Sequence, residues 1–215
     1  LRWVQRNIRA FRGDPARVMV FGESAGAVNT CTLLATPRAQ GLFTRAAIES
    51  GSCYASIPVE SARAQGMTYA ERAGCTNATD VATCLRGLSA EAALRALPSV
   101  VNVSGLEAAN ARWGPVVDGR VLPGRPYDRI VAGEHHRVPV VVGHNTEEVG
   151  LSVPAVMTEE MARAMLTQAF GAAVAQQLMQ RYPASQYATP RAALVQALTD
   201  ARFGCQARLS ARALA

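Results

Sequence analysis

Several features that mark other classes of protein are missing from this chain. It contains no lysine, so arginine supplies all 22 of its basic residues, and these stand singly rather than in clusters with interleaved aromatic residues. Despite the net charge of +6, scattered arginines favour a solvated surface over a nucleic-acid interface. No apolar run approaches the roughly 20 residues of a transmembrane helix. We therefore expect neither a nucleic-acid partner nor a membrane span.

The chain also lacks internal repeats, low-complexity linkers and a recognisable secretion signal. Its 215 residues, 49% of them hydrophobic and 18% charged, suffice for one globular domain with a sizeable core. Helical patterns are already in progress at Leu1 and still in progress at Ala215, without caps or stop signals. We therefore expect residues 1–215 to form a single partial domain, truncated at both ends. A missing secretion signal is then uninformative about a longer protein.

Strands and helices are predicted to alternate along the chain. Apolar runs predict strands over 18–22, 45–49 and 138–142, and the valine-rich third run predicts a strand buried on both faces. Apolar residues at helical spacing predict helices over 1–12, 24–35, 60–74, 78–87, 89–97, 127–133, 158–168, 171–181, 190–202 and 207–215. Strands separated by helices predict an α/β fold with a mostly parallel sheet.

The most specific motif lies between the first predicted strand and the helix that follows it. It has the form G-x-S-x-G and reads Gly22-Glu23-Ser24-Ala25-Gly26. In this context the motif indicates a nucleophile elbow, a strained strand-to-helix turn that exposes the serine hydroxyl above a sheet. Glycines on both sides are expected because a side chain at either position would clash within so tight a turn. The alternative is an ordinary strand-turn-helix unit with a surface serine.

Further short motifs occur along the chain in a fixed order. Starting with the first helix, they are Leu1-Arg2-Trp3-Val4, Ala47-Ile48-Glu49-Ser50-Gly51-Ser52, Trp113-Gly114-Pro115-Val116-Val117-Asp118-Gly119, Val138-Pro139-Val140-Val141-Val142-Gly143 and Asn145-Thr146-Glu147-Glu148. With the elbow, they resemble the type-B carboxylesterases, which include the cholinesterases, over essentially the whole chain. The resemblance implies a partial α/β-hydrolase fold with helical insertions. It also implies a serine hydrolase of small-molecule carboxylic esters that needs no cofactor and no metal.

The resemblance assigns catalytic roles to particular residues. Ser24 corresponds to the nucleophile that forms an acyl-enzyme, and a hydroxyl needs an adjacent base to attack. The backbone N–H of Ala25 corresponds to one donor of the oxyanion hole. Glu148, just beyond the strand at 138–142, corresponds to the acid of the triad, with Glu147 as the alternative. In the family, the residue after this glutamate is usually glycine, whereas here it is Val149.

The catalytic histidine is not evident among the three histidines of the chain. His135 and His136 precede a strand, at the wrong end for catalysis, and we interpret them as loop residues. His144 lies at the correct end but precedes the acid, which leaves it a minor candidate. In the family, the catalytic histidine lies further downstream and a glycine-rich oxyanion loop lies upstream of the elbow. We therefore expect residues 1–215 alone to turn over little or no ester.

A non-catalytic cholinesterase-like domain, used for binding or adhesion, is the alternative function. Such domains often lose the nucleophile, whereas this chain keeps both Ser24 and Glu148. Two further residues resemble family positions around the site. Glu23 resembles a buried glutamate that shapes its electrostatics, or else it is an acid near a helix N-terminus. Ser50 resembles a serine that hydrogen-bonds behind the triad, or else it caps a strand end.

The five cysteines cannot all pair within the chain. Cys75 and Cys84 match a disulfide of the family, and Cys205 matches a cysteine whose family partner lies downstream. Cys31 is expected to be a buried free thiol, and Cys53 has no evident partner. A disulfide would indicate an oxidising compartment, and thus a secreted or periplasmic full-length protein.

Overall fold

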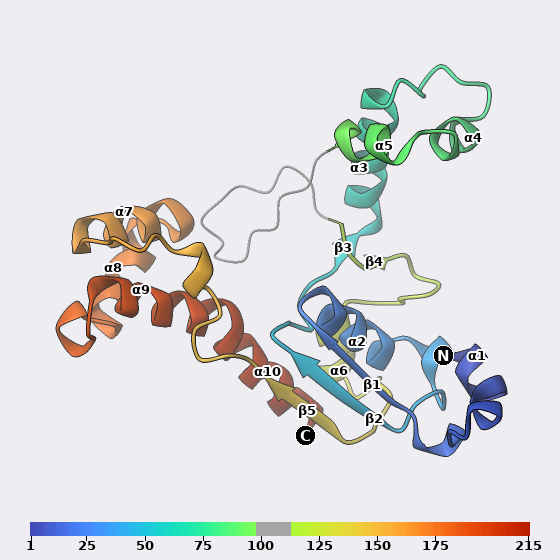
Figure 1. The fold of residues 1–215 in the computed structure, drawn as a ribbon, viewed down its shortest axis with the longest axis horizontal. Helices are drawn as coiled ribbons and strands as arrows, with labels where there is room; N and C mark the ends of the chain where they lie inside the picture. The colour runs from blue at the N-terminus through green and yellow to red at the C-terminus, as the bar shows by residue number, and fades with distance from the viewer. Residues whose placement is uncertain (98–112) are drawn as a thin grey trace.

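A parallel three-stranded sheet is the framework of the computed structural model, which describes residues 1–97 and 113–215 (Figure 1). Its strands are β1 (Met19–Glu23), β2 (Arg45–Glu49) and β5 (Val140–Gly143), in the order β1-β2-β5. The predicted α/β fold with a parallel sheet is confirmed. Because all three strands run the same way, the loops that follow them leave from one edge of the sheet.

Three helices cover one face of this sheet and enclose its core. They are α2 (Ala25–Ala35), α6 (Pro126–Val131) and α10 (Cys205–Leu214). Their apolar side chains pack against alternate residues of the strands, as the period of two in a strand requires. The buried members of this core include Val20, Ala46 and Ile48 from the sheet and Cys31, Leu34 and Ile130 from the helices.

The opposite face of the sheet is open within the described part of the chain. Phe21 of β1 and Val141 of β5 are 72% and 68% exposed. The prediction that the valine run would be buried on both faces was therefore wrong. A continuous apolar run is typical of two-sided burial, but the described helices that pack on the strands lie on one side only.

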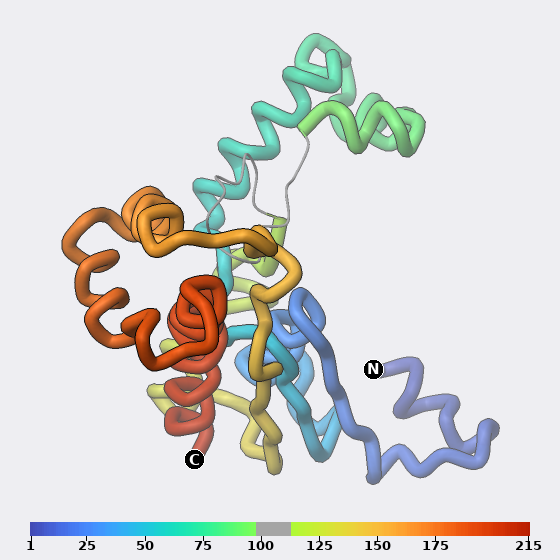
Figure 2. Tube along the Cα trace, turned by 60° about the vertical axis from the view of Figure 1, so that its left-hand side comes forward, coloured from blue at the N-terminus to red at the C-terminus, as the bar shows by residue number. Residues whose placement is uncertain are grey.

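A helical arm follows β2 and projects from the carboxyl end of the sheet (Figures 1 and 2). It contains α3 (Val59–Arg72), α4 (Val81–Arg86) and α5 (Ala90–Ala96). The two short strands β3 (Ile57–Pro58) and β4 (Val116–Val117) pair at its base. Strand β3 was not predicted, because a strand of two residues shows no measurable period. Helix α1 (Arg2–Asn7), continued by a 3-10 turn over Ile8–Phe11, lies at the N-terminus.

A second helical unit follows β5 and has a core of its own. Its helices are α7 (Glu159–Phe170), α8 (Ala172–Arg181) and α9 (Pro190–Thr199), which pack around Leu166, Leu194 and Leu198. The sequence predicted a break after 202, yet a π-helical segment, Asp200–Gly204, joins α9 directly to α10. Gly204 has an ordinary helical φ of −59°, so it does not terminate the helix.

Two disulfides are present among the described residues. Cys75 pairs with Cys84, as the family resemblance implied, and this bond closes the loop between α3 and α4. Cys31 pairs with Cys53, so the expectation of a free thiol at Cys31 was wrong. The two are 22 residues apart in the sequence, and only the packing of α2 beside the loop after β2 brings them together. Cys205 is free and exposed.

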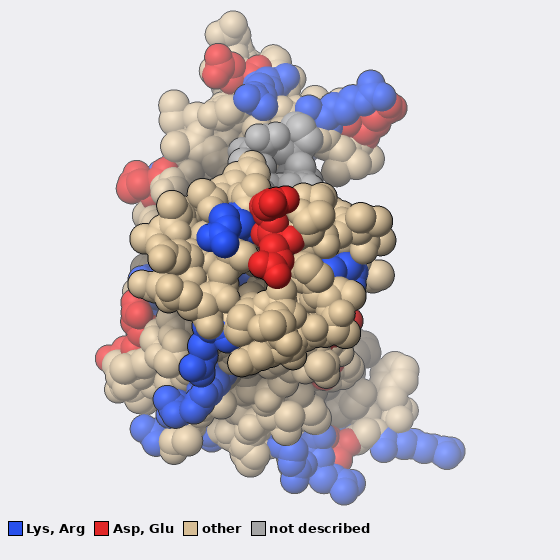
Figure 3. All heavy atoms as spheres, turned by 90° about the vertical axis from the view of Figure 1, so that its left-hand side faces the viewer, with Lys and Arg blue, Asp and Glu red and all other residues tan. Residues whose placement is uncertain are grey.

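Charged side chains are dispersed over the face of the molecule that Figure 3 presents. Basic and acidic residues form small groups on a largely uncharged surface, and at the upper right of the view residues of opposite charge touch. Within the described ranges, none of the helices combines the length and apolar character needed to cross a membrane.

Candidate active site

Ser24 lies at the junction of β1 and α2, in a backbone conformation that few side chains adopt. Its φ is 54° and its ψ is −112°, and its side chain makes no capping hydrogen bond to α2. The Ser24 N–H donates to the carbonyl oxygen of Glu49 at 2.9 Å, so the residue is still tied to β2. The side chain is exposed at the carboxyl edge of the sheet. This is the geometry of the nucleophile elbow that the motif predicts.

The two glycines of the motif are not equivalent. A Cβ atom on Gly22 would lie 2.3 Å from the carbonyl carbon of Gly26, closer than nonbonded atoms approach. Gly22 is therefore required for the strand to meet the helix. A Cβ atom on Gly26 would meet nothing within 4 Å, so the expectation of a clash at both positions was wrong for Gly26. Gly26 instead supplies the backbone that Gly22 must accommodate.

Ala25 is the first residue of α2, and its N–H has no acceptor within the helix. It follows Ser24 directly and is exposed at the same edge of the sheet. Unpaired amides at the N-terminus of an 11-residue helix carry partial positive charge. An oxyanion formed near the Ser24 hydroxyl would therefore be stabilised on this side.

Ser50 occupies a second strained position at the same edge, at the end of β2. Its φ is 53° and it is buried. Its N–H donates to the carbonyl oxygen of Gly143 at 2.8 Å, which links the end of β2 to the end of β5. A residue other than glycine with positive φ costs about 1–3 kcal/mol and persists only where its surroundings impose it. The ends of the three strands thus form one hydrogen-bonded edge.

Glu148 lies in the loop that follows β5 and is held by that loop. Its Oε1 accepts a hydrogen bond from the backbone N–H of Asn145 at 2.7 Å, and its Oε2 accepts one from the Asn145 side-chain amide at 3.4 Å. Glu148 is half-buried, whereas Glu147 is exposed. Because β5 is two strands from β1, this loop begins roughly 10 Å from the elbow. Of the two glutamates, Glu148 has the fixed carboxylate.

The His144 ring contacts the backbone of the same loop. Its Nδ1 lies 2.8 Å from the carbonyl oxygen of Asn145, and a Cβ atom added to Gly204, at the end of the π-helical segment, would lie 3.3 Å from the His144 Nε2. A catalytic base of the triad type would instead bond to the acid through Nδ1. The geometry therefore disfavours His144 as the base.

His135 and His136 lie near the C-terminal end of α2, the opposite end from Ser24. The His136 N–H donates to the carbonyl oxygen of Leu34, near the C-terminus of α2. Helix α2 is about 16 Å long, so Ser24 at its N-terminus is beyond reach of either imidazole. Burial lowers the pKa of both histidines, and the positive charge of Arg137 adds to the effect at His135. Both are structural loop residues, as the sequence indicated.

Glu23 differs from its expected environment. The resemblance implied a buried glutamate, but Glu23, the last residue of β1, is exposed. Its partners across the sheet are Glu49 and, one strand further, Gly143. It points to the open face of the sheet, on which Phe21 is also exposed. This explains its exposure.

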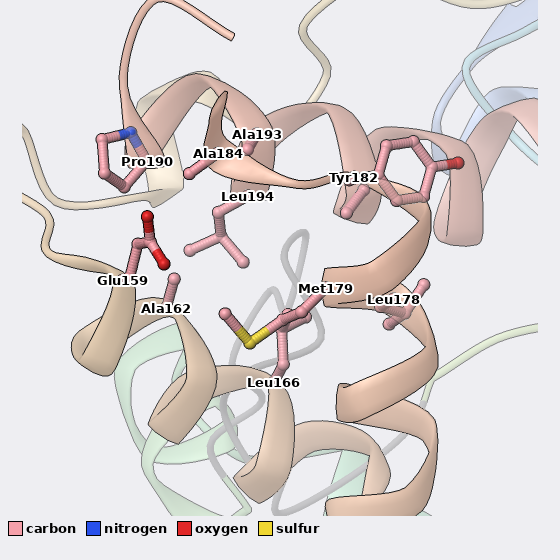
Figure 4. A pocket seen from close by; sticks show the side chains of 11 residues that line it. Glu159, Ala162, Leu166, Leu178, Met179, Tyr182, Ala184, Pro190, Ala193 and Leu194 are labelled. Atoms are coloured by element: carbon pink, nitrogen blue, oxygen red, sulfur yellow. The ribbon is translucent and has the colours of Figure 1, made fainter. Parts of the chain in front are cut away.

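A small cavity between α7, α8 and α9 is not a second candidate site. It measures about 20 Å³, room for a single water molecule. Its lining is mostly aliphatic, with the Glu159 carboxylate near Pro190 and the Tyr182 hydroxyl directed away from it (Figure 4). The described residues also contain no group of three His, Cys, Asp or Glu side chains placed to hold a metal ion. Within the described ranges, neither this cavity nor a metal cluster competes with the elbow as a candidate catalytic site.

Comparison with known proteins identifies the family that the chain resembles. The family model described as the carboxylesterase family matches residues 1–215. A secreted triacylglycerol lipase of Gibberella zeae is 35% identical over 69% of this chain and 26% of its own length. An acylcarnitine hydrolase of Mus musculus is 36% identical over 73% of this chain and 27% of its own. A cholinesterase of Mus musculus is 38% identical over 69% of this chain and 25% of its own.

Solved structures match a larger share of the chain. A PNB esterase superposes on 99% of this chain with a TM-score of 0.73 and 29% identity, and the match covers 43% of that protein. The EstA protein of Aspergillus niger superposes equally well, with a TM-score of 0.73 at 24% identity, which supports the fold alone. Among the curated relatives, by contrast, the match covers only about a quarter of each protein's own length.

Proposed function

The chain belongs to the carboxylesterase family, and on that premise we propose that it supplies the nucleophile and the acid of a serine carboxylic-ester hydrolase. Residues 1–215 would form part of one α/β-hydrolase domain in a longer protein. The observation that carries the proposal is the conformation of Ser24, which is exposed, has a φ of 54°, and lies between a strand and the N-terminus of α2.

The proposed reaction proceeds in two stages through Ser24. In the first, the Ser24 Oγ attacks the ester carbonyl carbon while a base removes its proton, and the carbonyl oxygen becomes an oxyanion beside the Ala25 N–H. Collapse of this intermediate expels the alcohol, which takes the proton from the base, and leaves an acyl-enzyme. In the second, water attacks the acyl-enzyme in the same manner and releases the carboxylic acid. Glu148 would orient and stabilise the protonated base.

The base in this proposal is a histidine outside the 215 residues. His135 and His136 lie at the far end of α2, and the Nδ1 of His144 is bonded to Asn145 rather than to Glu148. The glycine-rich loop that completes the family's oxyanion hole would also come from the remainder of the protein. Removing one triad member eliminates most of the rate, so we expect residues 1–215 alone to show little or no turnover.

Two observations support an oxidising compartment as the location of the protein. The structure contains two disulfides, and disulfides persist in extracellular or periplasmic surroundings. One relative is named as a secreted lipase. We therefore extend the proposal to a secreted or periplasmic enzyme that hydrolyses small-molecule carboxylic esters.

Steady-state hydrolysis of p-nitrophenyl esters by the full-length protein tests this function. The Ser24→Ala variant should lose activity by a factor on the order of 10⁴–10⁶. Ser61→Ala, which truncates an exposed serine on α3, is the matched control and should retain wild-type activity. A folded wild-type protein without esterase activity would favour the non-catalytic binding domain instead.

A further inference from the structure

The loop that carries Glu148 leaves β5 and continues into the helical unit formed by α7, α8 and α9. On its strand side the loop is held by Asn145, which donates two hydrogen bonds to the Glu148 carboxylate. Beyond Glu148, residues 149–154 form neither a strand nor an α-helix and contain one 3-10 turn, Gly150–Ser152. Contacts with other elements therefore have to fix segment 149–154.

Buried valines supply the apolar part of this fixation. Val149 and Val153 are both buried in the core of the helical unit. The same core contains Leu194 and Leu198 of α9. Because Val149 follows Glu148 directly in the chain, the direction of the Glu148 side chain depends on where this segment lies.

Hydrogen bonds from a single side chain, that of Arg191 in the first turn of α9, supply a polar part. Its Nε donates to the carbonyl oxygen of Pro154 at 3.1 Å. Its Nη2 donates to the carbonyl oxygen of Val153 at 3.4 Å and also to that of Gly150. The N–H donors of a guanidinium lie in a rigid plane, so one arginine can hold several acceptors in fixed positions. Arg191 thus ties α9 to the segment that begins directly after Glu148.

Arg191 lies where a cation is otherwise disfavoured. It is the second residue of α9, and the N-terminus of a helix carries partial positive charge. The ion pairs formed among the described residues do not include Arg191. The carbonyl oxygens of segment 149–154, rather than a carboxylate or the helix dipole, therefore account for the placement of its guanidinium.

We propose that Arg191 is a positioning residue that fixes segment 149–154 and thereby directs the Glu148 carboxylate toward the catalytic base. The inference rests on the proposed function, because it takes Glu148 as the acid. Without the guanidinium, three carbonyl oxygens lose this donor, and the segment is held to α9 mainly through its buried valines. The carboxylate can then turn from the base while Ser24 is unchanged. Because the acid stabilises the protonated base, kcat should fall and KM should change little.

The first test replaces the guanidinium in the full-length protein. Arg191→Met keeps an unbranched apolar stem, and Arg191→Lys keeps the charge but loses the planar fork. Arg163→Met, which replaces an exposed arginine of α7, is the matched control. With p-nitrophenyl acetate, we expect Arg191→Met to lower kcat by about 10- to 100-fold at nearly constant KM. Arg191→Lys should recover part of this loss, and the control should match the wild type.

A double-mutant cycle distinguishes positioning of the acid from a general loss of structure. Each Arg191 substitution is combined with Glu148→Gln. If Arg191 acts through Glu148, its replacement should lower kcat little further in the Glu148→Gln protein, because the two effects are then not additive. Should Arg191→Met fail to fold, Arg191→Lys takes its place in the cycle.

Two results would overturn the inference and leave the proposed function standing. One is wild-type kcat in the Arg191 variants, and the other is an equal loss of kcat with and without Glu148→Gln. Wild-type activity of Glu148→Gln alone would overturn both the assignment of the acid and this inference. A folded wild-type protein that hydrolyses no ester would refute the proposed function itself, and with it the role of Arg191.

Discussion

The N–H of Ser24 donates to the carbonyl oxygen of Glu49 at 2.9 Å, so the residue that leaves β1 for α2 is still hydrogen-bonded to β2. This bond explains how Ser24 keeps its positive φ of 54°. A conformation of this kind costs about 1–3 kcal/mol and needs surroundings that impose it. The sheet holds the residue from one side and the helix from the other, which presents the hydroxyl in a fixed place.

Replacing Gly22 by alanine should destabilise the protein because its Cβ would lie 2.3 Å from the backbone of Gly26. Forcing an atom into so tight a contact costs about 1–3 kcal/mol, and the elbow would have to shift. Gly26→Ala is the matched control, since its Cβ meets nothing within 4 Å and alanine favours a helix. Thermal unfolding of both variants checks this. Equal losses of stability would contradict the account of the elbow.

Glu148→Gln should lower kcat/KM of the full-length protein by about 10³–10⁴-fold, because the neutral amide cannot stabilise the charged base. The loop should keep its shape, since the amide oxygen can still accept from Asn145. Glu147→Gln, one residue earlier and exposed, should change kcat/KM little. If the Glu147 variant shows the larger loss in ester hydrolysis, the assignment of the acid is wrong.

The strand-turn-helix at Ser24 could be predicted from the sequence because its determinants are local. An apolar run, the glycine that the tight turn requires at position 22, and a helical run indicate it. The Cys31–Cys53 bond could not, because it depends on how α2 packs beside a loop 22 residues away. The burial of β5 was also mispredicted, since four similar valines do not show which face a helix covers. The proposal of Glu148 as the acid depends on the family resemblance, because the sequence pattern does not distinguish two adjacent glutamates.

Stability should fall as the pH drops below about 6.5, the usual pKa of histidine. Burial lowers the pKa of His136 in the folded protein, so the unfolded chain takes up the proton first. Folding stability is therefore complete above pH 6.5 and decreases as the pH falls toward the folded pKa. Melting temperatures between pH 7.5 and 5.5 measure this effect.

His136→Phe is the informative variant for this pH dependence. It keeps an aromatic ring against Phe43, whose centroid lies 4.7 Å from that of His136, and removes the titrating group. The melting temperature of the variant should vary less with pH than that of the wild type. Identical pH profiles would show that His136 does not couple protonation to folding.

Tyr182→Phe should destabilise the unit formed by α7, α8 and α9. The Tyr182 hydroxyl donates to Asp200 Oδ2 at 2.7 Å at the start of the π-helical segment. A hydrogen bond to a charged acceptor contributes about 1.5–3 kcal/mol. Tyr187→Phe is the control, because its ring lies near Tyr182 but no such bond to Asp200 is lost. Denaturant unfolding compares the two, and indistinguishable midpoints would contradict this role for Tyr182.

The most direct test of the central claim is to locate a fluorophosphonate adduct by mass spectrometry in the full-length protein. This reagent reacts with a serine only where a base and an oxyanion site activate it. The account predicts one adduct, on Ser24, and none on the Ser24→Ala variant or on residues 1–215 alone. An adduct on another serine, or a folded full-length protein that takes up no reagent, would contradict it.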